Sequence, residues 1–172
     1  IKLFNNTYRD VHFSIGNYFN EIAQSFGING LKLIESANYK YARSQIAMPG
    51  FVGGPWTLLL YMLNKQSPKK NFNFDIINKD ENLINELLKK IEEIICLHVD
   101  KQIEAGASVI QIFDSWAGLL PKRELAKYCY IPILKVVDHI KLKKIPVICF
   151  PKGIGKNYID FCSTVKPDCI SI

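Results

Sequence analysis

The sequence predicts an α/β fold with a parallel sheet, and two patterns carry that prediction. The first is an alternation of strand-like and helix-like segments that occurs three times along residues 46–172 and ends on a fourth strand-like segment. The second is the placing of glycine and proline, which end the apolar runs and begin the segments that follow. Strands that alternate with helices pair in parallel through right-handed crossovers. Four strands are about half of a (β/α)8 barrel, which needs roughly 250 residues, so we expect part of one TIM-type barrel.

The first strand is expected at residues 45–52, where an apolar run stops at two glycines. A short helix is expected from Trp56 to about residue 64, because Pro55 suits the first turn of a helix. Residues 65–79 are rich in lysine and asparagine and indicate a loop. This strand-to-helix junction is the kind of place where α/β folds put their chemistry.

A long helix is expected over residues 80–105. Asp80 or Asn78 could cap its start, and Gly106 is placed to end it. Its apolar residues recur at three- and four-residue steps, which predicts one buried face. They are Leu83, Leu87, Ile91, Ile94, Ile95 and Val99.

The second half of the chain repeats the alternation. Residues 108–114 read as a strand, and the near-continuous apolar run within them is typical of a sheet that is covered on both faces. A helix follows to about residue 140, with a kink or break expected at Pro132. Residues 145–150 predict the next strand, residues 155–165 a helix, and residues 169–172 the start of a further strand.

The first 45 residues are less regular. Residues 1–16 show no firm period and predict a connecting segment, while residues 17–42 show a helical pattern that Gly27, Asn29 and Gly30 interrupt. We therefore expect residues 1–172 to form one incomplete domain. It would have a connecting or helical segment at residues 1–45 and βα repeats at residues 46–172.

Composition narrows the class of protein. Of the 172 residues, 48% are hydrophobic and 22% are charged, which is typical of a globular protein. The sequence contains no run of about 18 uncharged apolar residues, so it predicts no membrane span. The net charge of +6 is spread over several lysine clusters, which favours solvated surfaces over a nucleic-acid interface but would help to recruit an anionic small substrate. Five scattered cysteines without metal-ligand spacing indicate a reducing, cytoplasmic compartment.

Candidate site residues lie at the ends of the expected strands. Asp114 and Ser115 follow the second strand, and the carboxyl end of a barrel strand is the catalytic face. Thr57 and Tyr61 share a helix face at four-residue spacing. From the pattern alone, Asp114 could equally cap a turn, and Tyr61 is more often a buried tyrosine than a catalytic one.

Several blocks of sequence together resemble the uroporphyrinogen decarboxylase family from about residue 46 to residue 172. The blocks are Gly50-Phe-Val-Gly-Gly-Pro-Trp-Thr57 with Tyr61-Met62, Gln102-Ile-x-Ala-Gly-Ala107, Gln111-Ile-Phe-Asp-Ser-Trp-Ala-Gly118 and Phe150-x-Lys-Gly153. The resemblance implies a single catalytic TIM-type barrel, usually a homodimer, that acts in heme biosynthesis. Such an enzyme removes carbon dioxide from the four acetate side chains of uroporphyrinogen, giving coproporphyrinogen. It uses no metal and no organic cofactor, because a protonated pyrrole can itself accept the electrons.

By match to these blocks, Tyr61 resembles the family's active-site tyrosine near the reacting acetate. Ser115 resembles the substrate-binding serine or threonine, and Phe51 the apolar residue that lines the cleft. Asp114 falls on a position that is acidic in the family. The family's N-terminal Arg-Gln-Ala-Gly-Arg segment, its essential aspartate and its late histidine have no counterpart here, so we expect this chain alone to be inactive.

Two alternatives remain open. The first is a cobamide-dependent methyltransferase of the same superfamily. These enzymes place a zinc-binding His-x-Cys where this chain has Phe150-Pro-Lys152, and the side chains of Phe150 and Lys152 cannot replace those two zinc ligands. The second alternative is a non-catalytic relative that binds a tetrapyrrole.

Overall fold

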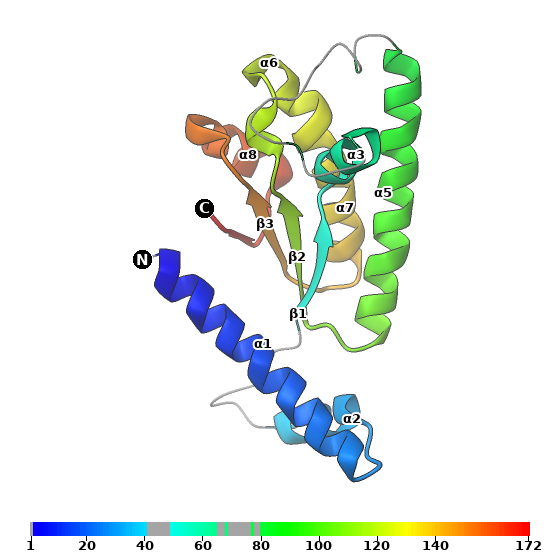
Figure 1. The fold of residues 1–172 in the computed structure, drawn as a ribbon, viewed down its shortest axis with the longest axis vertical. Helices are drawn as coiled ribbons and strands as arrows, with labels where there is room; N and C mark the ends of the chain where they lie inside the picture. The colour runs from blue at the N-terminus through cyan, green and yellow to red at the C-terminus, as the bar shows by residue number, and fades with distance from the viewer. Residues whose placement is uncertain (1, 41–48, 65–67, 69–76, 78–79) are drawn as a thin grey trace.

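The chain forms one parallel sheet that is covered by helices. The computed structural model describes residues 2–40, 49–64, 68, 77 and 80–172 (Figure 1). Within these residues the strands β1 (Pro49–Gly53), β2 (Val109–Asp114), β3 (Val147–Pro151) and β4 (Cys169–Ile170) pair in the order β1-β2-β3-β4. The spatial order equals the chain order, whereas an open doubly wound sheet reverses its order. The predicted α/β fold, with about four neighbouring strands of a TIM-type barrel, is confirmed.

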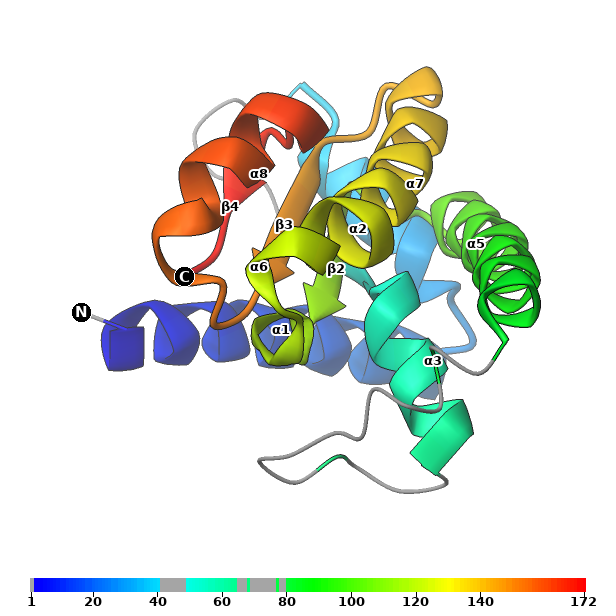
Figure 2. The same cartoon turned by 90° about the horizontal axis from the view of Figure 1, so that it is seen from above.

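Helices follow each of the first three strands. After β1 come α3 (Pro55–Asn64) and α5 (Glu81–Glu104). After β2 come the short 3-10 turn η1 (Ala117–Leu119), α6 (Lys122–Leu125), the π-helix η2 (Ala126–Tyr130) and α7 (Ile131–Leu142). After β3 come the 3-10 turn η3 (Gly155–Asn157) and α8 (Tyr158–Val165). Figure 2 shows α5, α7 and α8 in an arc along one face of the sheet.

The hydrophobic core lies between that arc and the sheet. Strands contribute alternate residues to it, because successive side chains of a strand point to opposite faces. Side chains with no exposed surface include Ile110, Ile112, Val147 and Cys149 from the strands and Val99, Val136, Val137, Ile140 and Phe161 from the helices. Each fully buried large aliphatic or aromatic side chain stabilises the fold by about 1.5–3 kcal/mol relative to its exposed state.

Helix α5 begins where the sequence predicts. The side chain of Asp80 accepts a hydrogen bond from the backbone N–H of Leu83 at 3.0 Å, which satisfies one of the free donors of the first turn. The chain leaves the helix through Gly106, whose φ of 96° suits glycine. One face of the helix is buried, as predicted, but it is formed by Ile84, Leu88, Ile91, Ile95 and Val99. Leu83 and Ile94, which the sequence placed on this face, are exposed.

The break expected at Pro132 takes the form of a π-helical turn. The backbone N–H of Ile131 donates to the carbonyl of Ala126, five residues earlier, so the helix is widened in the turn that precedes the proline. Proline has no N–H to continue the regular pattern, and it sits in the first turn of α7. The sequence therefore predicts the position of the break, while its geometry comes from the structure.

The expectation of a connecting segment at residues 1–16 is wrong, because α1 (Lys2–Ser25) begins at once. Gly27, with φ of 70°, ends the turn after α1, and Asn29 caps α2 (Gly30–Asn38) by accepting from the Lys32 N–H at 3.2 Å. The two helices form a hairpin beyond the amino ends of the strands (Figure 1). Residues 45–48 of the first predicted strand, and all of the predicted loop 65–79 except residues 68 and 77, lie outside the described residues.

Candidate active site

Three loops meet at the carboxyl ends of the strands. Backbone hydrogen bonds join them: Gly54 N donates to Phe113 O at 2.8 Å, Lys152 N to Asp114 O at 3.1 Å, and Gly118 N to Lys152 O at 2.9 Å. The approach between the second and third loops is close enough that a Cβ on Gly118 would lie 2.7 Å from the carbonyl oxygen of Gly153. One surface is therefore assembled from the ends of β1, β2 and β3.

The carboxyl group of Asp114 anchors the start of α3. Its Oδ1 accepts from the Thr57 backbone N–H at 3.1 Å and from the Thr57 hydroxyl at 2.5 Å. Gly54 makes room for this contact, since a Cβ there would lie 2.7 Å from the Cβ of Asp114. The carboxyl group thus holds the first turn of α3 directly over the end of β2.

Burial dominates the electrostatics of Asp114, whose side chain has no exposed surface. Desolvation raises the pKa of Asp114 to about 6, although hydrogen bonds from Thr57 and from the Cys129 thiol favour the ionised form. Among the described residues, no N–H or O–H group donates to the second carboxyl oxygen, Oδ2. Burial, and then the nearby carboxylate, raise the pKa of the Cys129 thiol well above its usual value, so this cysteine is a neutral thiol at pH 7.

Trp116 connects the same loop to the middle of α3. Its backbone N–H donates to Thr57 Oγ1 at 3.2 Å, and its carbonyl accepts from the indole N–H of Trp56 at 3.1 Å. Its own indole N–H donates to the hydroxyl of Tyr61 at 3.1 Å. The predicted shared face of Thr57 and Tyr61 is confirmed, because both side chains contact the loop that follows β2.

The structure thus brings three of the four sequence-predicted site residues together. Tyr61 is 40% exposed beside Trp116, and the half-buried Ser115 lies in the chain between Asp114 and Trp116. Asp114 lies beneath this surface, because residues 110, 112 and 114 of β2 face the helices. A direct contact of Asp114 with substrate stays a prediction, and its burial favours a supporting role.

Phe51 lies apart from this cluster, in the middle of β1. It is 60% exposed and forms a row with two phenylalanines of neighbouring strands on the face opposite the helices. The ring of Phe113 is 6.5 Å from that of Phe51 and 5.9 Å from that of Phe150, in both cases edge to face. Such a row offers an apolar surface to a flat ligand, and only its first member was a candidate from the sequence.

The two histidines whose side chains the structure describes lie on helices away from this cluster. His139 on α7 binds Asp100 of α5 at 2.9 Å. His98 is an exposed residue of α5, and the side chain of His12 lies outside the described part. No group of three or more His, Cys, Asp or Glu side chains that could hold a metal ion occurs within the described residues.

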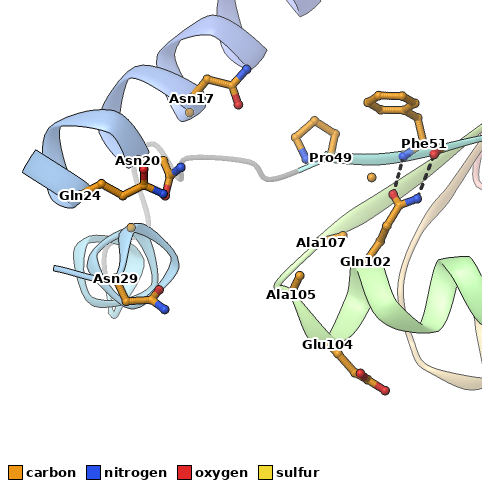
Figure 3. A pocket seen from close by; sticks show the side chains of 13 residues that line it. Asn17, Asn20, Gln24, Asn29, Pro49, Phe51, Gln102, Glu104, Ala105 and Ala107 are labelled. Carbon is orange, nitrogen blue, oxygen red and sulfur yellow. Dashed lines mark hydrogen bonds between the residues drawn. The ribbon is translucent and has the colours of Figure 1, made fainter. Parts of the chain in front are cut away.

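Gln102 holds Phe51 in place. It was not among the candidate residues chosen from the sequence, although it begins one of the quoted blocks. Its side-chain amide accepts from Phe51 N at 2.8 Å and donates to Phe51 O at 3.0 Å (Figure 3). The contact needs a glycine at position 50, because a Cβ there would overlap the Gln102 amide oxygen. An amide side chain near the end of the helix, together with a glycine in the preceding strand, is the signal in the sequence that could have found it.

A cavity of about 750 Å³ lies beside Gln102, between the amino end of β1 and the α1–α2 hairpin (Figure 3). Its described lining carries carboxamides from Asn17, Asn20, Gln24, Asn29 and Gln102, one carboxylate from Glu104, and no lysine or arginine. Among these described lining residues, an anionic ligand would find no opposite charge. The cavity is also at the far end of the strands from Tyr61 and Ser115, so it is distinct from the candidate site.

The part of the chain that the structure describes holds no helix long and apolar enough to cross a membrane. All five cysteines are free thiols. Burial raises the pKa of Cys149 to about 12, so this thiol, too, is neutral at pH 7 and acts as a small apolar side chain.

A parallel sheet in barrel order, with a tyrosine and a serine at its carboxyl ends, defines a portion of a TIM-type barrel enzyme. Residues 31–172 match the family described as uroporphyrinogen decarboxylase (URO-D), and the chain belongs to that family. Neither of the two alternatives that the sequence left open is favoured by this match.

Individual relatives agree with the family. The chain is 44% identical over 128 residues to a uroporphyrinogen decarboxylase from Rickettsia bellii, covering 72% of this chain and 37% of the relative. It is 39% identical over 136 residues to one from Orientia tsutsugamushi, covering 77% of this chain and 40% of the relative. A third, from Sulfurimonas denitrificans, is 37% identical over 111 residues, covering 63% of this chain and 32% of the relative. The chain thus spans about two fifths of the length of the first two relatives.

Proposed function

We propose that this chain supplies three βα units and a fourth strand to a barrel enzyme that decarboxylates the acetate side chains of uroporphyrinogen to give coproporphyrinogen. The observation that supports the proposal is the contact of Tyr61 with the indole of Trp116, the residue that follows Ser115 at the carboxyl end of β2, in a chain of the uroporphyrinogen decarboxylase family. The activity belongs to a protein that also contains the other units of the barrel, because this chain matches about two fifths of its relatives.

The chemistry suits a site of this kind without a metal or an organic cofactor. Protonation of a pyrrole carbon gives a cation, and that cation accepts the electron pair of the C–C bond as carbon dioxide leaves. The protein has to position a proton donor and stabilise the charge, which is general acid catalysis with electrostatic preorganisation. A net charge of +6 on this chain would favour the approach of a polycarboxylate.

Each predicted site residue has a role in this proposal. The hydroxyl of Tyr61 contacts the substrate near the reacting acetate, and Ser115 hydrogen-bonds a substrate carboxylate. Phe51, with the phenylalanine row beside it, packs against the pyrrole rings. Asp114 acts from beneath by holding Thr57 and the loop that carries Ser115.

We also propose that the complete enzyme is a homodimer in the cytoplasm, with no nucleic-acid partner. The family resemblance supports the dimer, and five free thiols are compatible with a reducing compartment. Size-exclusion chromatography with light scattering on a complete enzyme tests the dimer. A monomer at micromolar concentration would count against it.

Ligand binding tests the site itself. Uroporphyrin, the stable oxidised tetrapyrrole, is the probe, and its fluorescence is followed as the 172-residue chain is added. A hydrogen bond to a charged group contributes about 1.5–3 kcal/mol, so Tyr61→Phe should weaken binding by about tenfold or more. Tyr18→Phe, the same change at an exposed tyrosine of α1, is the control and should bind as the unchanged chain does. Equal affinity of all three proteins would remove Tyr61 from the site.

Activity of the chain alone is a separate question. We expect the purified 172-residue chain to form no coproporphyrinogen, because the family's substrate-binding arginines and essential aspartate have no counterpart in it. Detection of coproporphyrinogen in this assay would overturn that expectation.

A further inference from the structure

The hydroxyl of Tyr61 has a fixed hydrogen-bond direction that comes from its neighbour. An indole N–H can only donate, so in the 3.1 Å contact from Trp116 Nε1 the tyrosine oxygen is the acceptor. The single proton of that hydroxyl must then point elsewhere. Tyr61 as a residue is 40% exposed, so part of this side chain faces the surface at the carboxyl ends of the strands.

We propose that Trp116 is a positioning residue that fixes the Tyr61 hydroxyl as a hydrogen-bond donor toward the bound ligand. The ligand group that fits a fixed donor is an acceptor, such as a carboxylate oxygen. This last step rests on the proposed function, whereas the contact between the two side chains does not.

The backbone of Trp116 is itself held through both its N–H and its C=O group. Its N–H donates to Thr57 Oγ1 at 3.2 Å, and its carbonyl accepts from Trp56 Nε1 at 3.1 Å. Two indole N–H groups therefore take part in this arrangement. That of Trp56 hydrogen-bonds the loop backbone, and that of Trp116, which the loop carries, hydrogen-bonds Tyr61. The loop cannot turn without breaking at least one of these bonds.

The direction of the bond at Thr57 is determined as well. An ionised carboxylate can only accept a hydrogen bond. In the 2.5 Å contact, the Thr57 hydroxyl is therefore the donor and Asp114 Oδ1 the acceptor. A lone pair of the same hydroxyl is then left for the Trp116 N–H. The buried carboxyl group of Asp114 thus orients Thr57, Thr57 orients the Trp116 backbone, and the Trp116 indole orients Tyr61.

The chain contains only two tryptophans, which makes a direct test possible. In a 15N-labelled sample, the two indole N–H groups give two well-separated NMR signals, and Trp116→Phe assigns them by removing one. Tyr61→Phe keeps the ring but removes the accepting oxygen. We expect it to shift the Trp116 indole signal and to speed its exchange with solvent, while the Trp56 signal stays in place.

Thr57 supplies a second pair of variants. Thr57→Val keeps the shape but removes the hydroxyl, and it should move the Trp116 indole signal in the same direction as Tyr61→Phe does. Thr57→Ser restores the hydroxyl and should return the signal to its original position. Tyr18→Phe is the matched control for the tyrosine change and should move neither signal.

The outcomes separate this proposal from the proposed function. If Tyr61→Phe leaves the Trp116 indole signal unmoved in the folded chain, the positioning role is wrong, whatever the chain binds. If Tyr61→Phe moves that signal and Trp116→Phe weakens uroporphyrin binding by about tenfold, the positioning role and the proposed function are both supported. The loss of one oriented hydrogen bond predicts a change of this size. If the signal moves but Trp116→Phe binds uroporphyrin as tightly as the unchanged chain, Trp116 does not set a donor for the ligand and the proposal fails. If the unchanged chain binds no uroporphyrin, the proposed function fails in this chain, and the donor role toward a carboxylate falls with it.

Discussion

The side-chain amide of Gln102 hydrogen-bonds both backbone groups of Phe51, at 2.8 Å and 3.0 Å, as a neighbouring strand would. The backbone N–H and C=O groups of successive residues in a strand point to opposite edges, so residues three positions apart also do. Gly54 points toward β2, because its N–H bonds Phe113, so Phe51 points to the other edge of β1. A side chain of helix α5 therefore occupies part of that edge and holds Phe51 in place.

We predict that Gln102→Ala destabilises the chain by about 1–2 kcal/mol, since two partly exposed hydrogen bonds each contribute about 0.5–1.5 kcal/mol. Urea unfolding measures the loss, and amide hydrogen exchange should show faster exchange at Phe51. Lys101→Ala, on the exposed side of the same turn, is the control. Unchanged exchange at Phe51 would show that the amide does not protect this edge.

A methyl group at position 54 should disturb the site more than one at position 53. At Gly54 a Cβ meets Asp114 within 3.1 Å at three atoms, one of them backbone, whereas at Gly53 it meets only the end of the Leu58 side chain. Overpacking costs typically about 1–3 kcal/mol. We expect Gly54→Ala to show that loss in urea unfolding and Gly53→Ala to show much less. Equal effects would mean that Leu58 is as rigid as the backbone of β2.

Stability should depend on pH through Asp114. Its pKa is 3.8 in an unfolded reference and about 6 in the fold, so between these values the folded state binds more protons than the unfolded state. Stability must then fall as pH rises from about 4 to about 6, and level off above that. The shift corresponds to a cost on the order of 3 kcal/mol at neutral pH.

Urea unfolding between pH 4 and pH 8 measures this effect, with Asp114→Asn as the comparison. The variant cannot titrate at this position, so the difference in unfolding free energy between the two proteins should change over that window and be constant above it. A difference that is the same at pH 4.5 and pH 7.5 would rule out a raised pKa.

The carboxylate of Asp100 should change the free energy of unfolding in the opposite sense, at lower pH. The hydrogen bond from His139, together with that from Lys143 at 3.2 Å, lowers the pKa of Asp100. The contribution of Asp100 to folding stability is present above pH 3.8, and it is lost as the pH falls through the lowered pKa. Asp100→Asn should cost less than about 1 kcal/mol at pH 7, because the group is close to the surface, and added salt should reduce that cost. A larger loss that is independent of salt would indicate a packing role instead.

Much of the fold could be predicted because local signals agree with the tertiary structure. The apolar run before Asp114 and the glycine after α5 each specify one conformation, and Asp80 caps the helix that its position predicts. The part of helix α1 before residue 17 was missed because its first turns hold asparagine and threonine, which have weak helix propensity. The π-helical turn before Pro132 could not be predicted, since a proline marks a break without setting how the helix accommodates it.

The site was predicted in part. The spacing of Thr57 and Tyr61 and the strand-end position of Ser115 locate it, because both follow from regular geometry. The burial of Asp114 was available from the sequence as well, since residues 110, 112 and 114 alternate onto one face of β2. The contact from the Trp116 indole to Tyr61 was not, because it depends on the conformation of a loop for which no periodicity exists.

The central claim is that this chain carries one wall of a decarboxylase site, and a chimera tests it most directly. The matching 128 residues of the Rickettsia bellii relative are replaced by those of this chain, and conversion of uroporphyrinogen to coproporphyrinogen is measured. We predict an active chimera that loses activity about tenfold or more with Tyr61→Phe and keeps it with Tyr158→Phe, the same change on α8. A folded chimera without activity, or one that is indifferent to Tyr61→Phe, would contradict the account.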